Sequence, residues 1–128
     1  MELWDFRNGD RNEIFAWAQH LSKRDRAALN QKLDLLERLD FEQAIGLKLL
    51  AGPIQHSGHI LKLRASGDHA LRPLLCRGPH VPLHEYTLLK GARELDRKLE
   101  PPGVLDKAIE NRSHVHNDKE RRVKHERA

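Results

Sequence analysis

The chain has 128 residues, a length that favours one domain over several. Apolar residues make up 38% of it and charged residues 33%, which allows a modest core beneath a heavily ionised surface. The formal net charge of +4 favours an acidic partner, and no apolar run approaches the roughly 20 residues that would span a bilayer.

The first ten residues have no apolar run after a basic start, so we expect no secretory signal peptide. The only cysteine, Cys76, cannot form an internal disulfide and fits a reducing compartment, so we expect a soluble, cytoplasmic protein. The apolar residues of the segment LWDF predict a short opening strand, which ends at a turn formed by Asn8-Gly9.

Two helices are predicted next, from paired capping residues and apolar residues at helical spacing. The capping pairs are Asp10 with Glu13 and Ser22 with Asp25. The apolar positions are Ile14, Trp17, Ala18 and Leu21, and then Leu29, Leu33, Leu36 and Leu39. These patterns predict a helical hairpin that ends at about Asp40 and has one apolar face.

Three strands are predicted at about residues 59–65, 70–77 and 84–91. They follow a glycine-containing link, residues 43–58, in which a helical turn fits around Leu47 to Leu50. Pro73 cannot donate a hydrogen bond to a neighbouring strand, so it predicts a bulge or an unpaired side. The tight connection at Ser66-Gly67-Asp68 is typical of antiparallel neighbours.

A last helix is predicted over about Val104 to Arg112, after the helix-breaking Pro101-Pro102-Gly103. Residues 113–128 contain almost no apolar side chains and predict a basic, flexible tail. We therefore expect a single α+β domain over residues 1–112. In it, an N-terminal helical hairpin packs on one face of a consecutive antiparallel sheet of three to four strands, with a C-terminal helix, and the other face stays open and concave.

Basic side chains recur along the predicted strands and just beyond them. They are Lys62, Arg64, Arg72, Arg77, Lys90, Arg93, Arg97 and Lys98. Because side chains alternate along a strand, Lys62 and Arg64 share one face, and their apolar neighbours share the other. Such a sheet favours binding of a polyanion. The ordinary alternative is a solvated surface on which these cations pair with nearby Asp and Glu residues.

The segment ILKLRASGDHALRPLLCR, followed by TLLKGARELDRK, resembles the RelE/ParE superfamily of toxins from bacterial type II toxin–antitoxin systems. The resemblance is to the HigB-like, phage-associated branch and covers roughly residues 1–112. It implies a RelE-like fold and a ribosome-dependent endoribonuclease, an mRNA interferase that inhibits translation. The implied partners are a cognate antitoxin, often with a helix-turn-helix, and mRNA on the ribosome; no cofactor is implied.

The resemblance also implies roles for the basic residues, by their positions. It matches Lys62, Arg64, Arg72 and Arg93 to basic residues of the family, with Lys90 and Lys98 as neighbours. Together with the pattern of cations, it predicts Lys62, Arg64, Arg72, Arg93 and Lys98 as catalytic residues and Arg77, Lys90 and Arg97 as RNA-binding residues. The three arginines of the catalytic set would clamp the scissile phosphate, because a guanidinium binds two phosphate oxygens at once. Lys62 is the candidate general base, since neighbouring cations favour its neutral amine, and Lys98 is a candidate acid.

The family often has a Tyr or His just beyond the position of Arg93, and this chain has neither there. The identity of the general base therefore stays open, with His59 and His84 as further candidates. The nine histidines show no second ligand cluster, so we expect no metal site. Two other functions stay open: a ParE-like gyrase inhibitor that does not catalyse, and an inactive RelE-fold binding module.

Overall fold

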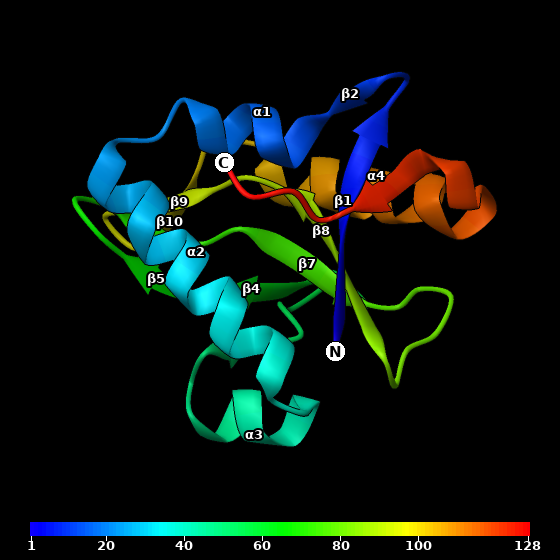
Figure 1. Ribbon diagram of the computed structural model, residues 1–128, viewed down its shortest axis with the longest axis horizontal. Helices are drawn as coiled ribbons and strands as arrows, with labels where there is room; N and C mark the ends of the chain where they lie inside the picture. Colours follow the sequence, from blue (N-terminus) through cyan, green and yellow to red (C-terminus); the bar gives the residue numbers. More distant parts are fainter.

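Four α-helices and two β-sheets make up the structure, a computed structural model that describes residues 1–128 (Figure 1). The helices are α1 (Glu13–Gln19), α2 (Lys23–Arg38), α3 (Phe41–Gly46) and α4 (Val104–Asn117), followed by a short 3-10 helix η1 (Lys119–Arg121). The main sheet contains β1 (Glu2–Asn8), β2 (Arg11–Asn12), β3 (Leu50–Ala51), β4 (Leu61–Leu63), β7 (Leu74–Arg77), β8 (Glu85–Lys90) and β11 (Arg122–Lys124). The second sheet contains β5 (Ala65–Ser66), β6 (Ala70–Leu71), β9 (Arg93–Leu95) and β10 (Lys98–Glu100).

The main sheet is mixed and has seven strands, in the order β11-β1-β8-β7-β4-β3, with β2 paired to β1. Strand β1 runs parallel to β8, and the other neighbours are antiparallel. The expected consecutive antiparallel sheet of three to four strands is therefore wrong. The opening strand pairs with the last long strand, β8, over Glu2 to Asp5, and only its end pairs with its sequence neighbour β2. Strand β11 pairs with the other edge of β1.

The second sheet, in the order β10-β9-β6-β5, exists because two of the predicted strands are interrupted. The first break is at Arg64, between the end of β4 and the start of β5, where the backbone N–H of Arg64 donates to the Leu49 carbonyl at 2.9 Å, next to the first residue of β3. The second is at Pro73, which has no N–H to donate, and the register shifts beside it, between Leu74 and Leu75. The irregularity predicted at Pro73 is thus confirmed. Beyond the breaks, β5 and β6 pair with each other, and β6 also pairs with β9.

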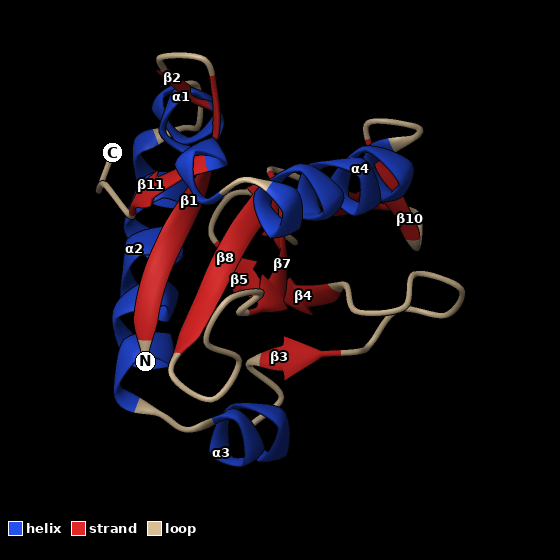
Figure 2. Ribbon diagram, turned by 90° about the vertical axis from the view of Figure 1, so that its right-hand side faces the viewer, coloured by secondary structure: helices blue, strands red, loops and turns tan.

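Helices cover both faces of the main sheet, with α2 and α4 on opposite sides (Figure 2). One core includes Leu3, Leu29, Leu33, Leu36, Leu75 and Leu88, and the other includes Leu74, Cys76, Leu89, Ala108 and Val115. Consecutive residues such as Leu74 and Leu75 belong to different cores because side chains alternate along a strand. The face that we expected to be open and lined with cations is therefore covered by α4.

The N-terminal helices do not pack as a hairpin: α1 lies mainly on β1 and β8, whereas α2 lies on β5. Ser22 caps α2 as predicted, accepting a hydrogen bond from the Asp25 N–H at 3.1 Å. Asn12, not Asp10, caps α1. The helical turn expected around Leu47 to Leu50 is absent there, and helix α3 lies earlier in the chain. None of the helices is long and apolar enough to cross a membrane.

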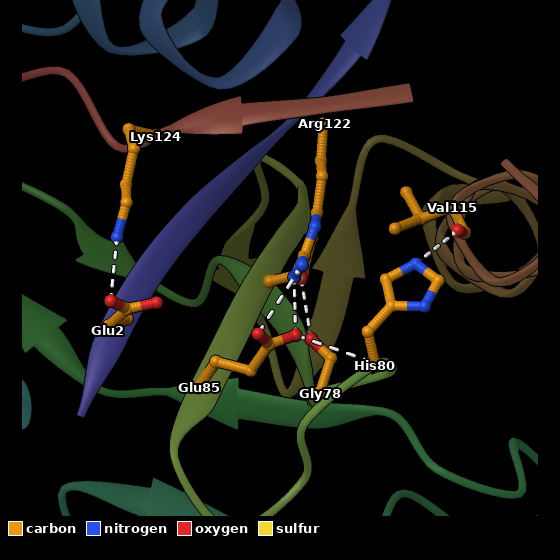
Figure 3. A network of polar contacts seen from close by, with 8 residues as sticks. Glu2, Gly78, His80, Glu85, Val115, Arg122 and Lys124 are labelled. Carbon is orange, nitrogen blue, oxygen red and sulfur yellow. Dashed lines mark hydrogen bonds and ion pairs between the residues drawn. The ribbon is translucent and has the colours of Figure 1, made fainter. Parts of the chain in front are cut away.

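The expected flexible tail is instead ordered. Helix α4 continues to Asn117, and β11 pairs with β1, Val123 lying opposite Asp5. Arg122 of β11 is buried and bonds to Glu85 (Figure 3). His125 lies 2.9 Å from the buried carboxylate of Asp5, between Nδ1 and Oδ1. The segment is held by buried polar partners, which a count of its apolar residues cannot reveal.

Candidate functional site

The five predicted catalytic residues do not meet in one pocket. Arg64 and Arg72 line a hollow beside α2. Arg93 lines a different pocket, with His69 and the start of α2. Lys98 is exposed on β10 and lines neither. The structure therefore places the residues in at least two sites rather than one clamp.

The hollow that contains Arg64 and Arg72 has a volume of about 470 Å³ and lies between α2, the α3–β3 turn and the β4–β5 junction. We call it the basic hollow. Its nine lining residues include four cations, Lys32, Lys48, Arg64 and Arg72, and no carboxylate. Leucines of α2 and of the α3–β3 turn form its apolar wall. Four cations around one concavity attract an anion more strongly than the same charges spread over a surface.

Backbone carbonyls orient the side chain of Arg72, which is only 13% exposed. Its Nη1 donates to the Leu71 carbonyl at 2.8 Å and, at 3.5 Å, reaches the Ala65 carbonyl. Arg64 is exposed, and the bond from its backbone N–H to Leu49 holds it beside the α3–β3 turn. The guanidinium of Arg72 is thus fixed in the wall of the hollow, while that of Arg64 stands free.

Lys48 occupies a backbone conformation that favours glycine, with φ of +60°. The N–H of Leu49 donates to the Ala44 carbonyl and that of Lys48 to the Ile45 carbonyl, both at 3.0 Å. These bonds form the usual glycine-containing end of a helix, here with a lysine at the glycine position. A cation near the end of a helix is favourable in itself, but it does not require a left-handed backbone. The strained position brings the ammonium to the basic hollow.

Lys32 and Lys48 could not be predicted from the pattern of cations along the strands, because Lys32 lies on a helix and Lys48 in a turn. Lys32 and Leu35 are three positions apart on α2, a spacing that places both side chains on one face of the helix. The one sequence signal for Lys48 is its position two residues after Gly46, at which helix α3 ends.

Glu94 of β9 partly neutralises two of the predicted catalytic cations. Its Oε1 lies 3.8 Å from the Nζ of Lys62, and its Oε2 lies 3.8 Å from the Nη2 of Arg72. Lys62 is not among the residues that line the basic hollow. A general base must be a neutral amine, whereas Glu94 pairs with the ammonium form. The geometry therefore argues against Lys62 as the base.

The three predicted RNA-binding residues lie on three different surfaces. The guanidinium of Arg77 stacks over the ring of Phe41, 4.1 Å from its centroid. Lys90 lines a pocket beside α4 with Asn111. Arg97 is exposed at the tip of the β9–β10 hairpin. They form no continuous track for a nucleic acid.

The remaining candidates for acid–base or metal chemistry are not at the basic hollow. His59 and His84 are exposed and do not line it. Burial raises the pKa of the Cys76 thiol to about 12, so the side chain is a neutral thiol in the core. No group of three or more His, Cys, Asp or Glu side chains could hold a metal ion. The basic hollow can therefore bind and position an anion, but it contains no histidine or carboxylate for proton transfer.

Comparisons with models of protein families, with curated proteins and with solved structures found no match to this chain. What the site does is therefore inferred from its own residues and from the sequence resemblance.

Proposed function

We propose that the chain binds the sugar–phosphate backbone of RNA in the basic hollow and acts as the toxin of a type II toxin–antitoxin system. Its activity is that of a ribosome-dependent endoribonuclease that cuts mRNA and stops translation. The observation that carries the RNA-binding part is the convergence of Lys32, Lys48, Arg64 and Arg72 on one concavity without a carboxylate in its lining. The cleavage and the ribosome dependence rest on the resemblance to the RelE/ParE superfamily.

The chemistry of the four cations suits a phosphodiester backbone. Arg64 and Arg72 can each bind two oxygens of one phosphate, while Lys32 and Lys48 act as point charges that accept several geometries. On a single strand, each neutralised phosphate contributes about −0.7 to the slope of log affinity against log salt. Aromatic side chains are absent from the hollow. Base stacking is therefore absent there, and we expect the hollow itself to have little sequence preference.

The proposed partner is a small antitoxin encoded next to the toxin, which would block the cations or wrap the helices. A neighbouring reading frame for a helix-turn-helix protein would support this part of the proposal. Co-expression with that protein should then relieve any growth arrest that the chain causes by itself.

A second candidate function is an RNA-binding module that does not cleave. The observation that favours it is Glu94, whose carboxylate contacts both Lys62 and Arg72. A carboxylate at this position opposes the transition-state charge that the catalytic cations would stabilise. Binding and cleavage therefore need separate tests.

RNA binding is tested by fluorescence anisotropy with a short, labelled single-stranded RNA at several salt concentrations. We expect Arg64→Ala and Lys32→Ala each to weaken binding and to reduce the salt slope by roughly one phosphate contact. Lys119→Ala is the matched control, because Lys119 is an exposed cation of η1 outside the hollow. Equal losses in all three variants would show that binding follows net charge and not the basic hollow.

The toxin function is tested by inducing the chain in growing bacteria and labelling new protein and new DNA separately. Early loss of protein synthesis, with cleaved mRNA, supports the endoribonuclease. Early loss of DNA synthesis supports a gyrase inhibitor and contradicts the proposal. Normal growth, with RNA binding intact in the purified protein, supports the binding module.

A further inference from the structure

A second pocket, of about 340 Å³, lies between α1, the start of α2 and the strands β6, β9 and β10. We call it the histidine pocket. Its polar and aromatic lining includes Trp17, His20, Asp25, His69, Arg93 and Glu100. It thus combines imidazole, guanidinium and carboxylate groups, whereas the basic hollow offers only cations, an amide and a hydroxyl as polar groups.

His69 is bound to Asp25 at two points. Its Nδ1 lies 2.7 Å from Oδ2 of Asp25, and its backbone N–H donates to Oδ1 at 3.0 Å. The side chain of Asp25 is 1% exposed and that of His69 is 51% exposed. Burial by itself would raise the pKa of Asp25, but the hydrogen bonds from His69 outweigh it and lower that pKa. Asp25 is therefore a carboxylate that accepts the hydrogen on Nδ1 of His69, so Nε2 is the ring nitrogen that has the lone pair in the neutral imidazole.

Two glycines allow the walls of this pocket to approach one another. A Cβ at Gly67 would lie 2.6 Å from Oδ1 of Asp25, so only glycine lets the β5–β6 turn reach the start of α2. A Cβ at Gly91 would lie 2.0 Å from Cδ2 of Trp17, so the indole packs directly on the backbone after β8. The indole thereby becomes a fixed aromatic wall, of the kind against which a nucleobase or a ribose packs.

The β5–β6 hairpin separates the histidine pocket from the basic hollow. Ser66 lines the hollow and His69 lines the pocket. The two residues flank one turn, across which the N–H of Gly67 donates to the His69 carbonyl at 3.2 Å. In the same way, Arg72 lines the hollow and the preceding Leu71 lines the pocket. A nucleic-acid strand bound in the hollow can therefore continue over the hairpin into the pocket.

From this geometry we infer that the histidine pocket is the acid–base centre for RNA cleavage, with His69 as the general base. The inference rests on the proposed function. Nε2 of His69 takes the proton of a ribose 2′-hydroxyl, and the 2′-oxygen forms a bond to phosphorus. The bond from phosphorus to the 5′-oxygen breaks, which leaves a 2′,3′-cyclic phosphate. His20, as an imidazolium, gives a proton to the departing 5′-oxygen, and Arg93 faces the negative charge that develops on the phosphate.

The pH dependence involves the charged and titratable groups that line the pocket with His69 or lie in its hairpin turn. They are Asp25 of α2, His20 of the α1–α2 link, Arg93 of β9, Glu100 of β10 and, in the hairpin turn, Asp68, which pairs with Arg24 at 3.6 Å. Cleavage needs a neutral His69 and a protonated His20, so its rate should pass through a maximum with pH. Removing His69 should remove the acidic limb of this profile, where the rate rises as the base loses its proton.

A purely structural role for the contact between His69 and Asp25 can be separated from catalysis. The bond from residue 69 to Oδ1 of Asp25 is made by the backbone N–H, so we expect a His69→Ala variant to keep it. The hairpin therefore keeps one of its two anchors while the imidazole is lost. His59→Ala is the matched control, because His59 is an exposed histidine outside the pocket.

The experiment compares wild type, His69→Ala and His59→Ala in cleaving a short synthetic mRNA, both on ribosomes and free in solution. We expect His69→Ala to lower the single-turnover rate by about 10² to 10⁴, to lose the acidic limb and to regain activity when free imidazole is added. Its affinity for the RNA should stay within about twofold of wild type, since the basic hollow is intact. His59→Ala should match wild type in all of these measurements.

The outcomes separate this inference from the proposed function. If wild type cuts RNA and His69→Ala cuts it equally fast, the inference fails and the proposed function stands. The same holds if the variant loses activity but keeps both limbs of the pH profile and is not restored by imidazole, because its role is then structural. If wild type binds RNA but cuts it neither on nor off the ribosome, the proposed endoribonuclease function fails, and the inference fails with it.

Discussion

Arg122 and Glu85 form a buried ion pair that joins the C-terminal strand β11 to the centre of the main sheet (Figure 3). Nη1 of Arg122 donates to Oε2 of Glu85, and Nη2 donates to Oε1 at 3.3 Å. The two side chains are 7% and 3% exposed. The guanidinium also lies over the ring of Trp4, 4.1 Å from its centroid. Each charge is out of water, so each depends on the other for its stabilisation.

Replacing Arg122 by methionine should strongly destabilise the protein. The change leaves the Glu85 carboxylate buried without its cation, which typically costs about 3–5 kcal/mol. The matched control is Lys124→Met, two residues along the same strand, because Lys124 also lies over Trp4 but pairs with Glu2 at the surface. Urea unfolding should show a large loss for the first variant and little change for the second. If both variants were as stable as wild type, residues 122–124 would contribute no more to the free energy of unfolding than a flexible tail does.

The same ion pair explains which parts of the fold the sequence could predict. The starts of α2 and α4, the region of β8 and the irregularity at Pro73 follow from capping, periodicity and proline chemistry, which are local. The parallel pairing of β1 with β8 and the docking of β11 depend on partners far away in the chain. A polar segment such as residues 118–128 looks disordered until its buried partners, Glu85 and Asp5, are in place.

Glu94→Gln should strengthen RNA binding. The substitution removes a negative charge that lies 3.8 Å from both Lys62 and Arg72, so both cations become available to phosphate. We expect a gain of about fivefold at low salt, equivalent to roughly 1 kcal/mol, which should disappear at high salt because screening removes it. Glu110→Gln, which releases Lys107 on the surface of α4, is the control and should leave binding unchanged. Weaker binding in Glu94→Gln would show that Glu94 positions Arg72 rather than neutralises it.

The site, like the fold, could be predicted only where it depends on local sequence patterns. Arg64 and Arg72 were identified from the strand pattern, and they do share a concavity. The alternation rule placed Lys62 with them, but the break at Arg64 turns the chain, and Glu94 takes up the ammonium of Lys62 instead. Such a carboxylate comes from a strand that is distant in sequence, and alternation within one strand cannot reveal it.

Lys48→Gly should make the protein more stable and a weaker RNA binder. Glycine adopts the φ of +60° without the steric cost that lysine has there, so we expect a gain of about 0.5–1 kcal/mol in urea unfolding. The loss of one cation from the basic hollow should at the same time lower RNA affinity and reduce the salt slope. Lys32→Gln, which removes a cation of the same hollow from a regular helix, should weaken binding without the gain in stability. If the Lys48→Gly variant bound RNA with unchanged affinity, Lys48 would not be part of the RNA-binding site.

Gly91→Ala should destabilise the protein because the new methyl group has no space. Its Cβ would lie 2.0 Å from Cδ2 of Trp17, and the indole would have to leave its position against the backbone. Overpacking of this kind typically costs about 1–3 kcal/mol. Gly46→Ala is the control, since nothing lies within 4 Å of its Cβ position at the end of α3. Thermal unfolding should separate the two variants, and tryptophan fluorescence should change only for Gly91→Ala.

The bonds between His69 and Asp25 predict that stability depends on this carboxylate in acid. The folded state lowers the pKa of Asp25 below its ordinary value of 3.8, because the hydrogen bonds from His69 outweigh the opposing effect of burial. A lowered folded-state pKa contributes stability above the pKa of the unfolded chain and loses that contribution as the pH falls through the folded-state value. In urea unfolding at pH 7 and pH 3, Asp25→Asn should therefore be less stable than wild type at pH 7 and lose less stability on acidification. Asp10→Asn, at an exposed turn, should follow wild type at both values. If Asp25→Asn and wild type lost the same stability between the two values, the folded state would not lower the pKa of Asp25, and the bonds from His69 would not stabilise its carboxylate.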